Sequence, residues 1–388
     1  MIERLGGNAA YVTGAVRSAV YCFDTGRVYS LNNHATDILT KYFLDTSRNL
    51  SQDDKDFILQ AEKLTGANFS EHEEYIFPEL RPEIKFAWLE LTHRCNFRCV
   101  HCYQGDLHNE TGGPLSFHEW QGVISQLAEL HCNNIQFIGG EPCLYGGLAD
   151  LIRFSHDAGI ENISLSTNLS HIDGELLSSF ADCGVQVNFS VYGASSNIHD
   201  RITRIPGSFE LLTRNIKRLN DSGISMRANV IIMRGNESFR DDIKAMLESL
   251  GVSHVKFDEI RGGDESLAPE NPRMQAHSPN FRTSRKSFEL NHSANSCWFG
   301  KFAVSPDGTI YPCEFERRIK YGNIRRERVA DILAGNEIRR WWYFSHNNIH
   351  PCSSCEYRLA CRDCRPICGN MTGKNPRCFY DPLSGEWR

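Results

Sequence analysis

Three cysteines stand close together in the chain, in the order Cys95-x3-Cys99-x2-Cys102. Thiolates at short spacing bind either zinc or iron–sulfur clusters. A [4Fe–4S] cluster needs four ligands, which are commonly cysteine thiolates. Three thiolates in one short loop would leave one iron open to a further ligand. The spacing therefore favours a cluster with an open iron, and a zinc site is the alternative.

A second group of eight cysteines lies towards the carboxyl end of the chain. Eight thiolates are enough to ligate two four-iron clusters fully. The two Cys-x2-Cys pairs within the group, taken alone, favour zinc instead. The four cysteines outside both groups are isolated, and we expect them to be packed side chains. The eight are Cys297, Cys313, Cys352, Cys355, Cys361, Cys364, Cys368 and Cys378.

The composition restricts the function that these cysteines can serve. The chain has 388 residues, 15 cysteines and a formal net charge of −6, so no broad basic surface for nucleic acid is expected. No run of about 18 apolar residues occurs, which predicts a protein with no membrane partner. We expect a cytoplasmic protein, where thiols stay reduced and serve metal sites rather than disulfides.

The elements around the first cysteine group alternate between strands and helices. Apolar strand-like runs at 84–91, 134–138, 162–166, 185–190, 226–232 and 255–260 are separated by segments with helical periodicity. Such alternation predicts an α/β fold with a parallel sheet, either a partial (β/α)6 barrel or an open doubly wound sheet. In both folds the site lies at the carboxyl ends of the strands. The first cysteine group directly follows the first of these runs.

The segments on either side of this alternating core have other sequence patterns. Residues 1–82 predict a small α+β domain with a hairpin over 18–31 and helices over 33–43 and 51–64. Residues 83–262 form the alternating core, and residues 263–290 are polar and turn-rich, as in a linker. Residues 291–388 form the cysteine-rich part, with a helix expected over 329–344. A basic stretch at 317–328 predicts a solvated face or a surface for an acidic peptide.

The segment from Cys95 to Tyr103 closely resembles the signature of the radical SAM superfamily. An open cluster iron can chelate the amino and carboxylate groups of S-adenosylmethionine, which is then cleaved to a 5′-deoxyadenosyl radical. The resemblance implies a role in cofactor binding for residues at four strand ends, with Arg201 or Arg204 pairing with the methionine carboxylate. Tyr192 stands where relatives often carry an aspartate. The implied cofactor residues are Tyr103, Gly139, Gly140, Glu141, Pro142, Ser166, Asn168, Ser190, Arg201 and Arg204.

The carboxyl-terminal cysteines resemble the SPASM extension of radical SAM maturases, which implies two auxiliary [4Fe–4S] clusters. Glu314 takes the place of an aspartate that is a proposed base in sulfatase-maturing relatives. Relatives carry a further cysteine about six residues before Cys297, where Asn291 and His292 stand here. The inner cluster therefore has an open iron or uses both Cys364 and Cys368. The resemblance implies an outer cluster on Cys352, Cys355, Cys361 and Cys378, and an inner one on Cys297 and Cys313 with Cys364 or Cys368.

The amino-terminal segment resembles the winged-helix-like leader-recognition domains of peptide maturases, which bind a leader peptide as an added strand. Together the resemblances imply a maturase that abstracts hydrogen from a ribosomal precursor peptide and installs a carbon–carbon or thioether crosslink or a related oxidative change. A reductant such as flavodoxin or ferredoxin is expected as a partner. The alternatives are an anaerobic sulfatase-maturating enzyme that forms formylglycine, and a zinc-binding module without catalysis.

Overall fold

The computed structural model describes residues 1–44, 50–105, 113–261, 265–269, 281–362 and 364–387. The chain forms two compact units. The first combines Met1–Pro82, Asn271–Phe299 and Arg340–Arg388, and the second combines Glu83–Glu270 and Gly300–Arg339. Each unit is described below by itself.

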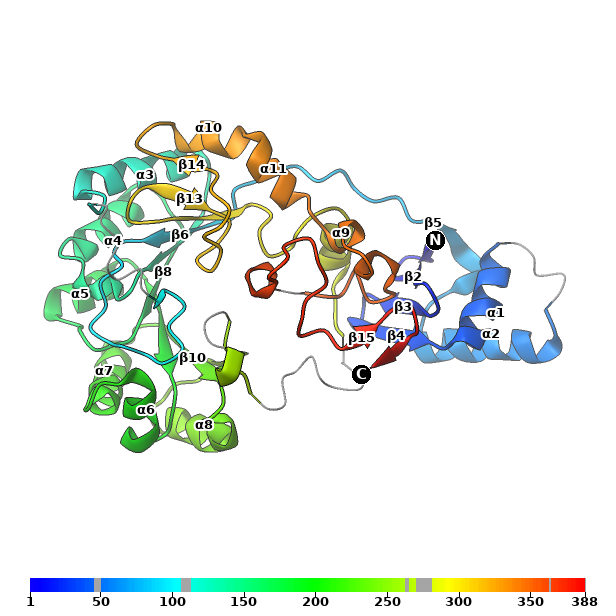
Figure 1. The fold of residues 1–388 in the computed structure, drawn as a ribbon, viewed down its shortest axis with the longest axis horizontal. Coiled ribbons are helices and arrows are strands. Elements are labelled where there is room, and N and C mark those ends of the chain that lie inside the picture. The colour runs from blue at the N-terminus through cyan, green and yellow to red at the C-terminus, as the bar shows by residue number, and fades with distance from the viewer. Residues whose placement is uncertain (45–49, 106–112, 262–264, 270–280, 363, 388) are drawn as a thin grey trace. The chain divides into compact units, whose positions relative to one another are not determined.

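The second unit is built on a parallel sheet with helices between successive strands (Figure 1). Its strand order follows the chain without reversal, whereas a doubly wound sheet reverses direction at a switch point. The predicted partial (β/α)6 barrel is therefore confirmed. The strands are β6 (Phe86–Glu90), β7 (Asn134–Ile138), β8 (Asn162–Thr167), β9 (Gln186–Val191), β10 (Met226–Ile232) and β11 (Val255–Glu259).

The helices of this unit pack apolar stripes against the sheet. In α3, a capping box of Ser116 and Glu119 starts the helix, and Trp120 and Leu127 lie on its buried face. Sequence periodicity predicted these helices except the short α6, whose polar ends mask its pattern. They are α3 (Phe117–Glu129), α4 (Leu148–Asp157), α5 (Gly174–Asp182), α6 (Ser196–Thr203), α7 (Ser208–Asp221) and α8 (Arg240–Ser249).

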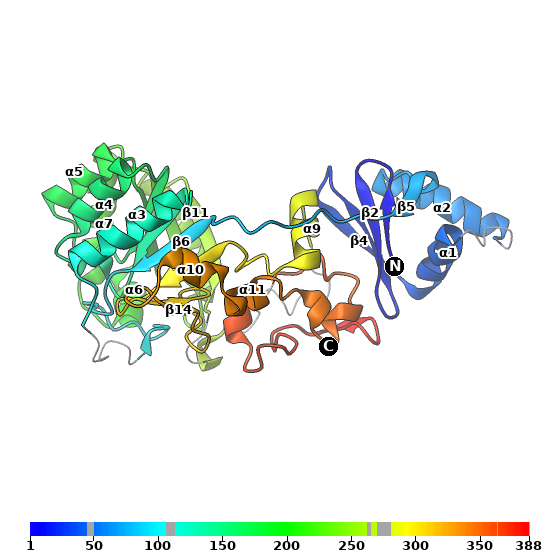
Figure 2. The same cartoon turned by 90° about the horizontal axis from the view of Figure 1, so that it is seen from above.

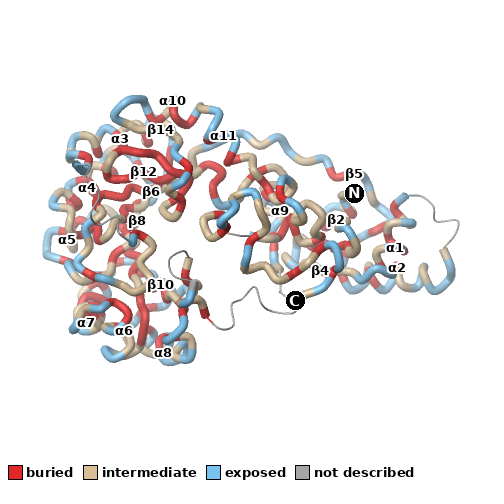
Figure 3. Tube along the Cα trace, viewed as in Figure 1, coloured by how far each residue is buried: buried red, intermediate tan, exposed pale blue. Residues whose placement is uncertain are grey.

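On several strands of this sheet, buried apolar residues alternate with residues that line a cavity. On β9, for example, Val187 and Phe189 are fully buried or nearly so, while Gln186, Asn188 and Ser190 line a cavity on the opposite face. A parallel sheet buried on both faces would have nearly continuous apolar strands. The alternation therefore shows that one face packs against the helices and the other borders an open space. Figure 3 shows the buried stretches of these strands.

Three further strands extend the sheet beyond β6. Strand β12 (Lys301–Val304) pairs in parallel with β6, and β13 (Thr309–Tyr311) and β14 (Gly322–Asn323) follow in antiparallel order. Residues 300–339 are thus part of the barrel unit, so the predicted cysteine-rich range 291–388 is divided between the two units. This pairing carries Cys313 and Glu314 to the end of β13.

The single helix expected over 329–344 is wrong. The segment forms two helices, α10 (Val329–Ala334) and α11 (Asn336–Trp342). They are separated by Gly335, whose extended backbone (φ −66°, ψ 157°) interrupts the helical hydrogen bonds. The apolar residues on either side of Gly335 continue the same helical period, so the sequence pattern gave no sign of the break.

The first unit contains a five-stranded antiparallel sheet, which confirms a small α+β module (Figure 2). Its order is β4-β3-β2-β1-β5, and α1 and α2 cover one face with Ile38, Leu39, Phe43 and Ile58. The elements are β1 (Ile2–Leu5), β2 (Ala9–Thr13), β3 (Ser18–Cys22), β4 (Arg27–Leu31), β5 (His72–Glu74), α1 (Asn33–Phe43) and α2 (Gln52–Thr65).

The other face of this sheet packs against later parts of the chain. Phe288 from α9 (Arg285–Ser293) and Leu359 are buried against Tyr21 and Val12. The predicted linker 263–290 is therefore partly wrong, because its end is helical from Arg285; residues 263–264 and 270–280 lie outside the described residues. A short ribbon, β15 (Tyr380–Asp381) with β16 (Glu386–Trp387), ends the unit. No helix among the described residues is long and apolar enough to cross a bilayer.

Candidate active site

The three cysteines of the first group lie together in the loop that follows β6. Burial raises the pKa of Cys95 to about 11 and that of Cys99 to about 12, and the neighbouring thiols of the set add to both shifts. This mutual influence shows that the three sulfurs are close to one another. Thiols with such raised pKa values ionise only when a cation such as a metal ion binds them.

Two glycines after β7 hold this loop against the sheet. A Cβ atom on Gly139 would lie 2.6 Å from the carbonyl oxygen of Thr92, and one on Gly140 would lie 2.4 Å from that of Arg94. The Gly140 amide donates to the Thr92 carbonyl at 2.7 Å. The resemblance implied that these glycines let the backbone approach the cofactor closely. The structure shows in addition that they admit the backbone of the cysteine loop.

Glu141 and Pro142 do not line the cavity, contrary to their predicted contact with the cofactor. The Glu141 carboxylate is fully buried and accepts hydrogen bonds from Thr167 Oγ1 at 2.6 Å and from the Asn168 amide at 2.7 Å. Pro142 is buried in a short helical turn, Pro142–Leu144. Glu141 therefore fixes the end of β8, where Asn168 faces the cavity.

One cavity of about 670 Å³ collects most of the other predicted residues. Cys95, Cys99, Cys102 and Tyr103 border it together with the two glycines. Its volume lies within the usual range of small-molecule sites, roughly 300–1,000 Å³. The strands supply a polar wall made of Gln136, Ser164, Ser166, Asn168, Gln186, Asn188, Ser190, Arg227 and Asn229.

The structure places Arg201 and Arg204 outside this cavity, against expectation. Both residues are exposed. Arg201 donates to the Gly235 carbonyl at 3.3 Å, and Arg204 ends α6 in the left-handed region at φ +57°. The cations that do line the cavity are Arg227, Lys256, Arg261 and Lys301.

Glu314 lines the cavity. Burial raises its pKa to about 7, although the nearby cations Arg261, Arg317 and Lys256 oppose the shift. The residue is partly exposed because it borders the cavity. A carboxyl group with this pKa can hold or release a proton near neutral pH.

Sequence reasoning missed a buried carboxylate beside Glu314. Glu90, at the end of β6, is fully buried and accepts from Gln104 Nε2 at 2.6 Å and from Arg317 Nη2 at 2.7 Å. Its signal in the sequence was an acidic residue at the end of an otherwise apolar strand. Arg317, a member of the predicted basic stretch, therefore serves as the arginine that pairs with the buried Glu90 carboxylate.

The basic stretch as a whole does not form an open cationic face. Most of its basic residues are exposed, as the predicted solvated face requires, and four of its arginines are paired with acidic residues of the same unit. The pairs are Arg317 with Glu90, Arg318 with Glu316, Arg325 with Glu119, and Arg328 with Glu129.

The cysteines predicted to hold the outer cluster all belong to the first unit. Burial raises the pKa of Cys355, and the thiols of Cys352 and Cys378 contribute, so these three sulfurs are neighbours. Cys297 belongs to the first unit and Cys313 to the second, so neither unit tests the predicted inner ligand set. Within the described ranges no group of three or more Cys, His, Asp or Glu side chains is arranged to hold a single metal ion.

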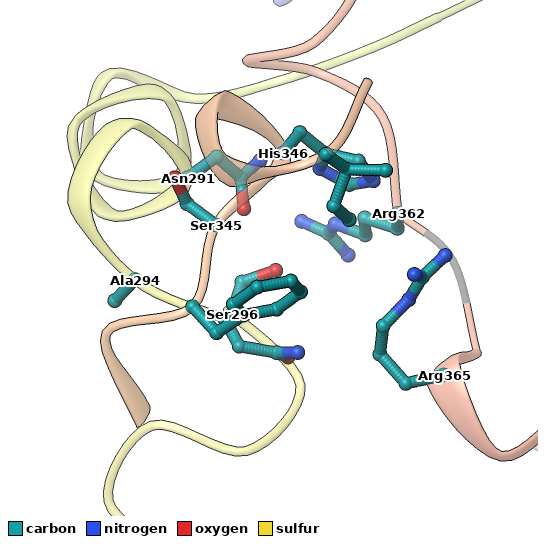
Figure 4. A pocket seen from close by; sticks show the side chains of 10 residues that line it. Asn291, Ala294, Ser296, Ser345, His346, Arg362 and Arg365 are labelled. Atoms are coloured by element: carbon teal, nitrogen blue, oxygen red, sulfur yellow. The ribbon is translucent and has the colours of Figure 1, made fainter. Parts of the chain in front are cut away.

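A small pocket lies in the first unit beside these cysteines (Figure 4). Arg362 and Arg365, each next to a cysteine in the sequence, border it together with His346. Arg365 is only 2% exposed and donates to the carbonyls of Met371 and Gly373 at 3.0 and 2.7 Å. Asn291, one of the two residues that stand where the resemblance implies a further cysteine, donates to the Leu359 carbonyl at 2.9 Å.

Comparison with known proteins identifies both cysteine groups. Residues 89–250 match the radical SAM superfamily, and residues 296–356 match the SPASM iron–sulfur cluster-binding domain. The AdoMet-dependent heme synthase of Oleidesulfovibrio alaskensis is 26% identical over 76% of this chain and 87% of that protein. The PqqA peptide cyclase of Rhodopseudomonas palustris is 24% identical over 76% of this chain and 86% of that protein.

A solved structure shares the fold over nearly the whole chain. Streptococcus suis SuiB bound to its precursor peptide SuiA has a TM-score of 0.62 and 10% sequence identity, and covers 97% of this chain and 99% of that one. The two family matches show that the chain contains a radical SAM domain and a SPASM domain. It binds a [4Fe–4S] cluster with S-adenosylmethionine, and its SPASM domain binds iron–sulfur clusters. The zinc-module alternative is wrong.

The described residues fit the cluster and S-adenosylmethionine. Three adjacent thiols supply the donor set of a cluster with one open iron. Two buried polar atoms on cavity-lining residues, His101 Nδ1 and Asn188 Oδ1, have no hydrogen-bond partner among the described residues. Buried polar atoms are seldom left unpaired, so both indicate a polar ligand in this cavity.

Proposed function

We propose that this enzyme modifies a ribosomally made precursor peptide and installs a crosslink, either a carbon–carbon bond or a thioether, or a related oxidative change. One observation carries the proposal: the cluster cysteines, the polar wall and Glu314 line the same cavity. A radical formed near the cysteines would therefore meet a substrate group that also faces a carboxyl group.

The cofactor supplies the reactive species, since cluster-bound S-adenosylmethionine yields a 5′-deoxyadenosyl radical on one-electron reduction. Cys95, Cys99 and Cys102 would hold the cluster, and the cavity wall beside them, where S-adenosylmethionine would bind, includes Tyr103, Gly139, Gly140, Ser166, Asn168 and Ser190. Removal of one hydrogen atom leaves a carbon radical on the peptide. Bond formation then releases one electron and one proton, so the peptide loses two hydrogen atoms in all.

Glu314 is the proposed acceptor of that proton, at its carboxylate oxygen. Its position on the cavity wall supports this role. Cys297 and Cys313, with Cys364 or Cys368, would hold an auxiliary cluster, and such a cluster would supply an acceptor for the released electron. Cys352, Cys355, Cys361 and Cys378 hold the outer cluster, and a flavodoxin or ferredoxin supplies the electron that starts the reaction.

The amino-terminal module supports a peptide substrate. Its sheet ends in β4 and β5, and an extended peptide can add to a sheet edge through main-chain hydrogen bonds. The likeness to SuiB covers 97% of the chain and so includes this module. The heme synthase relatives nevertheless make an iron porphyrin the second candidate substrate.

The test is anaerobic incubation of the enzyme, S-adenosylmethionine and a reductant with any short peptide that is found encoded beside its own gene. We expect the peptide to lose the mass of two hydrogen atoms, and Glu314→Gln to retain 5′-deoxyadenosine formation but slow crosslinking. Conversion of a cysteine-containing sulfatase peptide to formylglycine, or of an iron porphyrin, with the precursor unchanged, would contradict the proposal.

A further inference from the structure

Arg227 is a cation of the cavity wall to which the proposed reaction gives no role. It is the second residue of β10, it is exposed, and it lines the cavity. Two other cations of the wall, Lys256 and Arg261, both contact the Asp258 carboxylate, at 2.6 and 3.0 Å. The Arg227 side chain makes no hydrogen bond or ion pair with any residue that the structure describes. Because a guanidinium stays protonated in proteins, its positive charge is uncompensated at this place on the wall.

Arg227 belongs to a row of polar residues that crosses three parallel strands. In the sheet register, Arg227 lies beside Asn188 of β9, and Asn188 lies beside Ser166 of β8. All three line the cavity, and the row is about 10 Å wide because neighbouring strands lie about 4.8 Å apart. Asn188 is 6% exposed, and its Oδ1 has no hydrogen-bond partner in the described part of the chain. The row therefore presents guanidinium donors next to an unused buried acceptor.

The position of Arg227 along β10 separates it from the carboxylate of S-adenosylmethionine, which the open iron chelates at the cysteine loop. That loop packs against the other end of the strand, where Cys99 and Val100 contact the buried cluster that contains Met233. From residue 227 to residue 233 the strand advances about 20 Å, at about 3.3 Å per residue. This distance exceeds the reach of an arginine side chain, so the methionine carboxylate is not the group that neutralises Arg227.

The chemistry of the row describes the ligand that fits it. A guanidinium binds a carboxylate through two parallel hydrogen bonds, whereas Asn188 Oδ1 needs an N–H or O–H donor. An acidic residue within a peptide supplies both, because its side chain is a carboxylate and its main chain carries N–H groups. An iron porphyrin supplies carboxylates, but its ring nitrogens bind the metal and carry no proton. The pair of Arg227 and Asn188 therefore favours a peptide.

We propose that Arg227 is a specificity-determining residue that binds the carboxylate of an aspartate or glutamate in the part of the precursor peptide that enters the cavity. Asn188 accepts a main-chain N–H of the same peptide segment. The inference rests on the proposed function, because it takes a peptide as the substrate. It adds to that function a chemical requirement on the peptide, namely an acidic residue near the site of modification.

The experiment uses the precursor peptide of the test above and a set of its variants, in each of which one acidic residue is replaced by the corresponding amide. We measure kcat/KM for modification of every peptide by the wild type and by Arg227→Gln. A charge-assisted hydrogen-bonded contact should be worth about tenfold to a hundredfold in kcat/KM. We expect this loss in Arg227→Gln with the unchanged peptide, and in the wild type with one amide peptide. The two changes together should cost no more than either alone, because both remove one contact.

Arg214→Gln is the matched control, because Arg214 is an exposed arginine on α7 that does not line the cavity. Its kcat/KM should equal that of the wild type for every peptide. Arg227→Lys keeps the charge without the planar fork and should show a smaller loss than Arg227→Gln, and it serves if Arg227→Gln fails to fold. The Kd of S-adenosylmethionine, measured by equilibrium dialysis, should be the same in Arg227→Gln as in the wild type.

Three results would overturn the proposal while the peptide is still modified and the proposed function stands. They are a modified peptide without an acidic residue, a loss in Arg227→Gln that adds fully to that of every amide peptide, and weaker S-adenosylmethionine binding by Arg227→Gln. Failure of the proposed function looks different, because the peptide is then unchanged and iron coproporphyrin is converted. In that case, a loss of iron coproporphyrin binding in Arg227→Gln would assign the carboxylate to a porphyrin and refute the peptide assignment.

Discussion

At the residue scale, the spacing of the cysteines predicted a cluster site, and the structure places those cysteines together in one loop. Cys95, Cys99 and Cys102 are adjacent in the chain, so their convergence needed no knowledge of the fold. Glu90, Arg227 and Asn188 could not be assigned in this way, because the partners that define their roles come from other strands. The alternation of polar residues on β7 to β10 was the one available signal of a cavity wall.

The ion pair of Arg317 with Glu90 allows the contribution of one such non-local contact to stability to be measured. Replacing Arg317 by methionine leaves the fully buried Glu90 carboxylate with Gln104, and with His93 Nε2 at 3.7 Å, but without its arginine. We expect Arg317→Met to lower the free energy of unfolding by about 3 kcal/mol, as for a broken buried ion pair. Urea unfolding of the anaerobic protein measures this, and adding Glu90→Gln should recover part of the loss.

The control is Arg328→Met, because Arg328 and its partner Glu129 have side chains that are 65% and 63% exposed. An exposed pair of this kind contributes less than about 1 kcal/mol. Equal losses in the two variants would show that burial of Glu90 does not strengthen its pairing with Arg317.

At the element scale, helices and strands of the barrel were predictable because their periodicity is local. The β7 and β10 ranges agree with the prediction at both ends. The break at Gly335 and the pairing of β12 with β6 were not predictable. A glycine inside a helical pattern is compatible with either outcome, and a parallel pairing between distant segments depends on the closed fold.

The close approach of two elements at Gly140 makes a sharp prediction. In Gly140→Ala the new Cβ would lie 2.4 Å from the Arg94 carbonyl oxygen, so the cysteine loop must shift. We expect a destabilised enzyme with less iron at the first cluster and little 5′-deoxyadenosine. Iron content and thermal unfolding of the reconstituted variant measure the two effects.

Gly146→Ala changes a glycine in the same β7–α4 connection, where a Cβ would have no atom within 4 Å. It should bind iron and unfold as the wild type does. The steric account of the glycine pair is contradicted if Gly140→Ala matches Gly146→Ala in both measurements.

At the scale of the whole molecule, the amino-terminal sheet and the carboxyl-terminal cysteines belong to one compact unit. Tyr21 donates to the Glu356 carbonyl at 2.6 Å, and Arg358 donates to the Thr13 carbonyl at 2.8 Å. Both bonds are made by residues that follow Cys355 closely in the chain, so the module expected to bind a peptide also contacts the segment of a predicted cluster ligand. Sequence patterns divided the chain into consecutive domains because they contain no information on such contacts.

Phe288 lies at the centre of this unit and tests the coupling. It is fully buried, and its ring lies 5.0 Å from that of Tyr21 and 5.1 Å from that of Tyr75. Phe288→Ala should cost about 3–5 kcal/mol and lower the iron content by about four atoms, one cluster. Thermal unfolding and iron analysis check both.

Leu64→Ala removes an apolar side chain that is 69% exposed in the same unit, and it should change neither property. If Phe288→Ala lowers stability but keeps its full iron content, the packing of the unit does not support the outer cluster.

The most direct measurement is 5′-deoxyadenosine formation by anaerobically reconstituted wild-type enzyme and Cys95→Ala, with S-adenosylmethionine and a reductant. The wild type should contain about twelve iron atoms with matching sulfide and form 5′-deoxyadenosine. The variant should keep the auxiliary iron and form none. Undiminished 5′-deoxyadenosine in Cys95→Ala would contradict the assignment of the catalytic cluster to this cavity.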